Sequence, residues 1–269
     1  MTKRLLFRAA ILCLCVLPLG AGARAGTDIL PHRALYELSM LSNRDANVLA
    51  VDGDMAFEWQ DSCDGWSVNQ RSQMAFYYDG GETTKINWSL VSWEAKDGGA
   101  YRFIVRQMTD GKLTDEFRGD AAVEPNGGAG TAHYTAPDEH TVTLPNGSLF
   151  PSAHSLALIE RALAGETLFW AQVFDGSDAE GLFGVSAVIT PLSAAARARA
   201  DAEPQLKGVA GWHVALAFFA PEGQAAEPEH EQQLDLFANG VVDELELDYG
   251  DFTVLAALKK LEPLPDPKC

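Results

Sequence analysis

The sequence predicts a mainly β protein, with about a dozen antiparallel strands in one curled sheet and one main helix near residues 152–164. Three observations support this prediction. Several segments alternate apolar and polar residues with the period of two that a half-buried strand requires. Tight-turn sequences separate these segments, and only one long segment has helical spacing. An open flat sheet rarely holds so many strands, so we expect a closed, half-closed or spiralled sheet.

The first strand is expected at residues 32–40, because one of its faces is apolar and consists of Ala34, Tyr36, Leu38 and Met40. The same alternation recurs at residues 244–249, where leucine and tyrosine alternate with acidic residues. Each segment is expected to bury one face of its strand and to expose the other.

Glycine-containing turns are expected to join the strands as antiparallel neighbours. The Asn-Gly dipeptide at 239–240 separates two strand-like segments, 232–238 and 241–248. The Asp-Gly dipeptide at 110–111 has the same role between two earlier segments, and Asp-Gly-Gly sequences bracket a strand at 85–96. Such dipeptides readily adopt the positive φ angles of a tight hairpin turn.

One segment departs from the strand pattern and predicts the main helix. Ser152 is expected to cap its N-terminus, and Gly165 is expected to end it. Leu156, Ile159 and Leu163 form an apolar stripe that can pack against the sheet.

Three further segments are less regular in sequence. Residues 193–208 are expected to be irregular apart from a short helix at 194–200, and residues 221–231 are rich in Pro, Glu and Ala. Residues 252–261 fit a strand or a helix. The prolines that follow favour an extended tail that reaches Cys269.

Residues 1–25 are expected to be a cleaved signal peptide, and residues 26–269 a single β domain. Basic residues precede an apolar run at 9–19, and an Ala-Arg-Ala sequence precedes the expected cleavage point. The run is shorter than the ~20 residues of a spanning helix, so no transmembrane segment is expected. Lipidation at Cys13 or Cys15 is disfavoured, because neither cysteine follows the small residue of a lipobox.

Two cysteines, Cys63 and Cys269, remain after cleavage. Export would place them in an oxidising compartment, where two thiols are normally paired. We expect a structural disulfide, and closing so long a loop stabilises a fold by roughly 5 kcal/mol in the loop-entropy model. The alternative, a redox-active thiol, is disfavoured because neither cysteine belongs to a Cys-x-x-Cys pair.

The chain is strongly acidic, with a formal net charge of −18 that becomes −22 once the four basic residues of segment 1–25 are removed. Such a field repels nucleic acids and anionic membrane surfaces, so neither is expected as a partner. Solubility in an exposed compartment explains the charge more simply than a specific cationic ligand, which stays open as an alternative.

No catalytic motif stands out. The chain lacks a Gly-x-Ser-x-Gly elbow, a glycine-rich phosphate loop and a Ser-x-x-Lys set. His230 and Glu231 resemble the start of a zincin motif, but Leu234 occupies the position of the second ligand. We therefore expect no enzymatic activity, no catalytic residues, no metal site and no cofactor.

The remaining polar candidates have simpler explanations. His133 and His140 could converge in a loop, but their spacing suits a metal poorly and we expect surface histidines. His154 is expected to be buried or to lie near the start of the helix, and not to act as a base. The acidic segment 175–181 suggests calcium, yet it lacks the ligand alternation of an EF-hand and is explained by a turn.

Aromatic residues are concentrated in the first third of the chain. We expect most of them to pack in the core, and the alternative is an apolar trough for a lipid tail, a peptide or a glycan. These residues are Trp59, Trp66, Phe76, Tyr77, Tyr78, Trp88 and Trp93.

Several segments occur in a characteristic order over nearly the whole chain beyond residue 25. They are HRALYELSM at 32–40, CDGWSVNQR at 63–71, LFPSAHSLALIERALAG at 149–165, VFDGSD at 173–178, WHVALAFF at 212–219, NGVVDELELDYGDF at 239–252 and the terminal cysteine. With these landmarks, the chain resembles the EipB family of periplasmic cell envelope integrity proteins.

The resemblance implies an open, spiralled antiparallel sheet shaped like a cup or half-shell, in the periplasm, with a disulfide between Cys63 and Cys269. It also implies a non-enzymatic role in envelope integrity and stress resistance. We expect an envelope component or a periplasmic protein to bind the concave face, without a prediction of the binding residues. We also expect the protein to be a monomer. The alternatives are a periplasmic lipid or lipoprotein carrier, and a hydrolase whose site assembles around His133, His140 or His154.

Overall fold

The computed structural model describes residues 29–44, 47–124, 127–220 and 227–269. The expected signal peptide, with Cys13 and Cys15, and residues 221–226 of the Pro/Glu/Ala-rich segment lie outside this part of the chain. The described part contains fourteen strands in one antiparallel sheet and two helices. The prediction of a mainly β, curled antiparallel sheet is confirmed.

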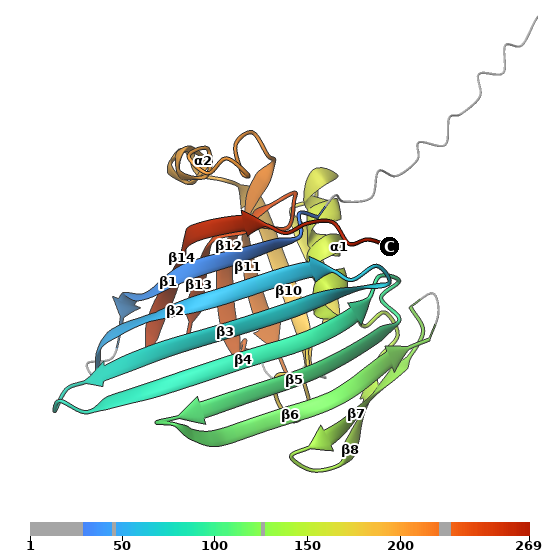
Figure 1. The fold of residues 1–269 in the computed structure, drawn as a ribbon, viewed down its shortest axis with the longest axis horizontal. Coiled ribbons are helices and arrows are strands. Elements are labelled where there is room, and N and C mark those ends of the chain that lie inside the picture. The colour runs from blue at the N-terminus through green and yellow to red at the C-terminus, as the bar shows by residue number, and fades with distance from the viewer. Residues whose placement is uncertain (1–28, 45–46, 125–126, 221–226) are drawn as a thin grey trace, which may run out of the picture.

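The sheet consists of two meanders that meet in its middle. The first meander comprises β1 (His32–Asn43), β2 (Val48–Asp61), β3 (Gly65–Tyr78), β4 (Thr83–Ala95), β5 (Ala100–Thr109), β6 (Lys112–Val123), β7 (Gly130–Ala136) and β8 (His140–Leu144). The second comprises β9 (Leu168–Phe174), β10 (Leu182–Pro191), β11 (Gly211–Phe219), β12 (His230–Phe237), β13 (Val242–Asp248) and β14 (Phe252–Pro263). Because β1 pairs with β14, the edges of the sheet are β8 and β9. Figure 1 shows β14 in front beside β1 and the strands β10 to β13 behind the first meander, so the sheet curls over on itself.

The two edge strands, β8 and β9, face each other across a seam without pairing, and residues of both, such as Thr141 and Gln172, line an open space there. A single parallel bridge joins the segment after β8 to β9: the Leu149 amide donates to the Gln172 carbonyl at 2.8 Å, and the Leu149 carbonyl accepts from the Phe174 amide at 2.9 Å. Beside this bridge, an aromatic cluster packs with ring centroids 5.2 to 6.4 Å apart and consists of Tyr101, Phe103, Tyr134, Phe150 and Phe174. The sheet is therefore nearly closed without a continuous hydrogen-bond ladder, in agreement with the expected half-shell.

Helix α1 (Pro151–Leu163) connects the two meanders and stands at one end of the curled sheet (Figure 1). Its existence and its end were predicted, and Gly165 has the positive φ of 79° that a helix-terminating glycine adopts. The predicted apolar stripe is partly wrong: Ile159 is fully buried, but Leu163 is 55% exposed. The buried face includes Leu158 and Ala162 instead, because the helix packs with this side against the core.

The predicted serine cap of α1 is wrong. Phe150 occupies the N-cap position and contributes no side-chain hydrogen bond. The carboxylate of Glu94, at the end of β4, accepts from the backbone amides of Ser152 at 2.6 Å and Ala153 at 2.7 Å. A strand residue distant in sequence thus satisfies the first amides of the helix, whose partial positive charge favours an anion.

The short helix expected at residues 194–200 is present, and the structure decides the ambiguous segment. The short helix α2 spans Ala194–Ala200 and is held by Arg199, whose guanidinium lies 2.8 Å from the buried Asp235 and 2.7 Å from the buried Asp243. The ambiguous segment 252–261 forms strand β14, because it pairs with β1 on one side and β13 on the other. Within the described residues, neither helix is long and apolar enough to cross a membrane.

Candidate functional site: an interior cavity

A cavity of about 440 Å³ lies inside the curled sheet. Met55 and Phe57 line it from the first meander, and Leu216, Leu245 and Leu247 line it from the second. Helix α1 contributes part of the wall at the same end of the fold where Glu94 holds it. Small-molecule sites typically measure roughly 300 to 1,000 Å³, so the cavity has the size of a ligand site.

Strand alternation explains why this wall is apolar. Successive side chains point to opposite faces of a strand, so Met55 and Phe57 line the cavity while Glu58, between Phe57 and Trp59, pairs with Arg33 on the exposed side. In the second meander, the cavity-lining Leu245 lies opposite Leu234 across the β12–β13 pair. The pattern that predicted half-buried strands thus also builds the interior surface.

Polar side chains gather where α1 and the segment after β9 line the cavity. His154 and Ser155 come from α1, and Asp175 and Ser177 come from the turn that follows β9. The Asp175 carboxylate accepts from the Ser177 amide at 2.8 Å, and burial raises the pKa of Asp175 to about 6. The cavity is therefore amphipathic, with an apolar body and a polar end.

Two nitrogens in the wall have no hydrogen-bond partner within the described residues, Nε1 of Trp59 and Nε2 of His154. Trp59 is only 4% exposed and His154 only 7% exposed. Burial lowers the pKa of His154 to about 4, so its imidazole is neutral near pH 7. Both nitrogens are shielded from the cavity as well as from solvent, so they are buried atoms of the wall and not contacts for a bound molecule.

The cavity wall contains no lysine or arginine among the residues that the structure describes. Its second histidine, His230, stacks on Phe218 with ring centroids 4.2 Å apart, and burial lowers its pKa. Both histidines are thus uncharged near neutral pH, whereas Asp175 is ionised above its pKa of about 6. The wall carries negative charge at its polar end and no positive charge to balance it.

The seven aromatic residues singled out in the sequence separate into core, cavity and surface positions. Trp59 and Trp88 line the cavity, and Trp66 packs edge-on against Trp59 with ring centroids 5.7 Å apart. Trp93 lies on the other face of β4, where its ring contacts the Arg102 guanidinium at 5.2 Å. Of the others, Phe76 is buried and Tyr78 packs against the same core, whereas Tyr77 is exposed. Core packing and an apolar trough thus each account for part of the set.

The histidine candidates do not assemble into one site. His133 is exposed and bonds Thr141, whereas the neighbouring Tyr134, opposite His140, is fully buried on the other face of the sheet. His140 contacts the Ala179 carbonyl with Nε2 at 2.8 Å and so spans the seam. Within the described ranges, no group of three or more His, Cys, Asp or Glu residues could hold a metal ion.

The turn segment that suggested calcium uses its carboxylates to stabilise its own backbone. Asp178 accepts from the amides of Glu180 and Gly181, as Asp175 does from that of Ser177. What the sequence did not reveal is that this turn presents Asp175 to the interior cavity, since that depends on the curl of the sheet.

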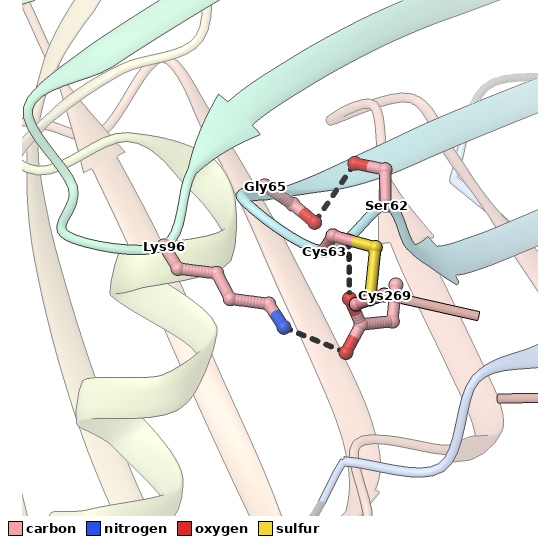
Figure 2. Close-up of a disulfide and its surroundings, with 6 residues drawn as sticks. Ser62, Cys63, Gly65, Lys96 and Cys269 are labelled. Atoms are coloured by element: carbon pink, nitrogen blue, oxygen red, sulfur yellow. Dashed lines mark hydrogen bonds and ion pairs between the residues drawn. A yellow bond between two sulfur atoms is a disulfide. The ribbon is translucent and has the colours of Figure 1, made fainter. Parts of the chain in front are cut away.

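The cysteines expected to pair are joined in the structure. Cys63 lies in the turn between β2 and β3, and its Cα is 5.8 Å from that of Cys269. Figure 2 shows the disulfide beside an ion pair, in which Lys96 Nζ lies 2.7 Å from an Asp61 carboxylate oxygen. The other oxygen of Asp61 accepts from the Cys63 amide at 2.8 Å. The bond thus fastens the end of the chain beside the strands that carry Trp59 and Glu94.

Comparisons with known proteins agree with this architecture. Residues 23–265 match a family model described as EipB-like. The chain is 29% identical over 250 residues to the cell envelope integrity protein EipB of Brucella abortus (strain 2308). The aligned region covers 90% of this chain and 87% of that protein. It is also similar to the crystal structure of a beta-barrel-like protein of a domain of unknown function from Brucella abortus. That likeness has a TM-score of 0.80 and 26% identity, over 88% of this chain and 99% of the other.

Proposed function

The chain belongs to the EipB-like family, and from this premise we propose that it acts in the periplasm and supports envelope integrity by holding an envelope component in its interior cavity. The relationship to a cell envelope integrity protein supports the general role. The cavity supports the more specific part of the proposal, because it is a mostly apolar space of about 440 Å³ enclosed by the curled sheet and α1. This observation carries the proposal.

A small apolar or amphipathic molecule fits this space better than a folded protein partner does. The volume lies within the range of small-molecule sites, and the inward faces of the strands supply mostly apolar side chains, with Gln70 and Gln232 as polar exceptions. Such a wall suits a lipid tail. A bound lipid would be consistent both with the role in envelope integrity and with the lipid-carrier alternative.

We propose binding and not catalysis. Nε2 of His154 has no hydrogen-bond partner among the described residues, and hence contacts no hydroxyl or thiol that it could activate as a base. The buried imidazole is also held neutral with a pKa of about 4, below the range in which a general base works best at neutral pH.

Native mass spectrometry of the protein isolated from the periplasm tests this proposal. We expect an adduct of small mass that dissociates on denaturation. The Leu247→Trp variant, in which a larger side chain occupies part of the cavity, should lose the adduct. The matched Leu113→Trp variant should keep it, because Leu113 lies on β6 and is 55% exposed. Wild-type protein without any adduct, or equal adducts in both variants, would count against the proposal.

A further inference from the structure

We propose that the molecule held in the cavity has a head group that donates hydrogen bonds and carries no negative charge, so that fatty alcohols, amines or amides bind in preference to fatty acids. This inference rests on the proposed function, since it specifies the ligand of the same cavity. It is carried by the charges and the hydrogen-bonding groups of the cavity wall.

The first argument is the missing counter-charge. No lysine or arginine lines the cavity in the described part of the chain, and its two histidines, His154 and His230, are neutral near pH 7 because burial lowers their pKa. An anionic head group would therefore leave water without forming an ion pair. Burying an ionised carboxylate without a partner is far more costly than burying a hydroxyl or an amide.

The second argument excludes the usual alternative to a cationic side chain. The N-terminus of a helix can bind an anion through its free amides, and Pro151 at the start of α1 lines the cavity. Here the amides of Ser152 and Ala153 already donate to Glu94, at 2.6 and 2.7 Å. The positive end of α1 is thus occupied by the protein's own carboxyl group, and a ligand anion would find no free amides there.

The third argument is the set of groups that a donor would meet. The Asp175 carboxylate and the Ser155 and Ser177 hydroxyls belong to the polar end of the cavity. A carboxylate only accepts hydrogen bonds, and a hydroxyl can accept them. A hydroxyl, amine or amide head group could donate to this end, whereas a carboxylate head group could not.

Calorimetric titration of the oxidised protein with 1-decanol, decylamine and decanoate at pH 7.5 tests the inference, because the three share one chain and differ in the head group. We expect decanol and decylamine to bind at least about tenfold more tightly than decanoate. Decanoate that binds as tightly as decanol would overturn this inference and leave the proposed function standing. Failure of all three to bind would overturn the proposed function, and the inference with it.

A conservative variant identifies the source of the discrimination. Asp175→Asn keeps a carbonyl oxygen for the Ser177 amide but removes the negative charge, so the affinity for decanoate should rise about fivefold relative to that for decanol. Asp97→Asn is the matched control, because Asp97 accepts from the Gly99 amide in the same kind of turn but is exposed and does not line the cavity. An unchanged ratio of affinities in Asp175→Asn would refute the role of this carboxylate.

Discussion

The hydrogen bonds from α1 to Glu94 give the structure a testable pH dependence, which the Glu94→Gln substitution isolates. Glu94 is 2% exposed, and burial raises its pKa from 4.5 to about 7 in spite of the two backbone amides that stabilise its ionised form. The burial penalty therefore outweighs the hydrogen bonds. The folded state is favoured most when Glu94 is protonated, although at neutral pH a large share of the molecules carry the charge.

The sign of the effect follows from linkage. A folded-state pKa above the unfolded value means that this contribution to the free energy of unfolding is fully present below pH 4.5 and is lost as the pH rises through about 7. A difference of one in pKa between the folded and unfolded states corresponds to about 1.4 kcal/mol, so the Glu94 contribution should fall by about 2 to 3 kcal/mol between pH 5 and pH 8. Glutamine does not titrate and lacks this fall.

Urea unfolding followed by circular dichroism at pH 5, 6, 7 and 8 measures this difference. We expect Glu94→Gln to be more destabilising at pH 5 than at pH 8, by about 2 to 3 kcal/mol. Glu160→Gln is the control, because Glu160 is exposed on α1 and should leave the pH profile of the wild type unchanged. A destabilisation by Glu94→Gln that is constant with pH, or that grows toward pH 8, would refute the reasoning.

Three further predictions concern other parts of the molecule. Reduction of the Cys63 disulfide should lower the free energy of unfolding by roughly 2 to 5 kcal/mol without abolishing the fold, and loss of the native circular dichroism spectrum at ambient temperature would contradict this. Arg199→Ala leaves two buried aspartates without their cation, so it should lower the free energy of unfolding by about 2 kcal/mol after allowance for the 39% exposure of the arginine. Arg106→Ala removes an arginine whose partner is more exposed, and should lower it by less than about 1 kcal/mol in the same denaturant assay. His154 should show no protonation in an NMR titration from pH 8 to pH 5.5, because burial lowers its pKa to about 4, and a midpoint above pH 6 would contradict its burial.

The elements of this fold were largely predictable because their signals are local. Alternation placed the strand at residues 32–40, which forms the first part of β1, and glycine chemistry placed the hairpin turns and the end of α1. The disulfide was predictable from the two cysteines that lie beyond the expected signal peptide. Each of these inferences needs only neighbouring residues or a count.

What the sequence could not supply depends on contacts between distant residues. Ser152 is a residue type that N-cap positions favour. The helix amides instead bond Glu94, because β4 ends beside the start of α1. The segment 252–261 was ambiguous because only its pairing with β1 and β13 decides for a strand. The cavity could not be located for the same reason: Trp59, His154 and Asp175 share a wall only once the second meander has curled over the first.

The pairing of the first strand with the last has a consequence for the order of assembly. His32 lies opposite Pro263, so the centre of the sheet joins segments from the two ends of the folded chain. The other pairs in the sheet join strands that are consecutive in the chain, most of them as local hairpins. Local hairpins can form early, but a contact across nearly the whole chain pays the largest loop-closure entropy and depends on the final strand. A chain that lacks β14 would lose the strand that joins the two meanders into one sheet among the described residues. The enclosed cavity is in this sense a late product of folding, and only a complete chain can hold a ligand in it.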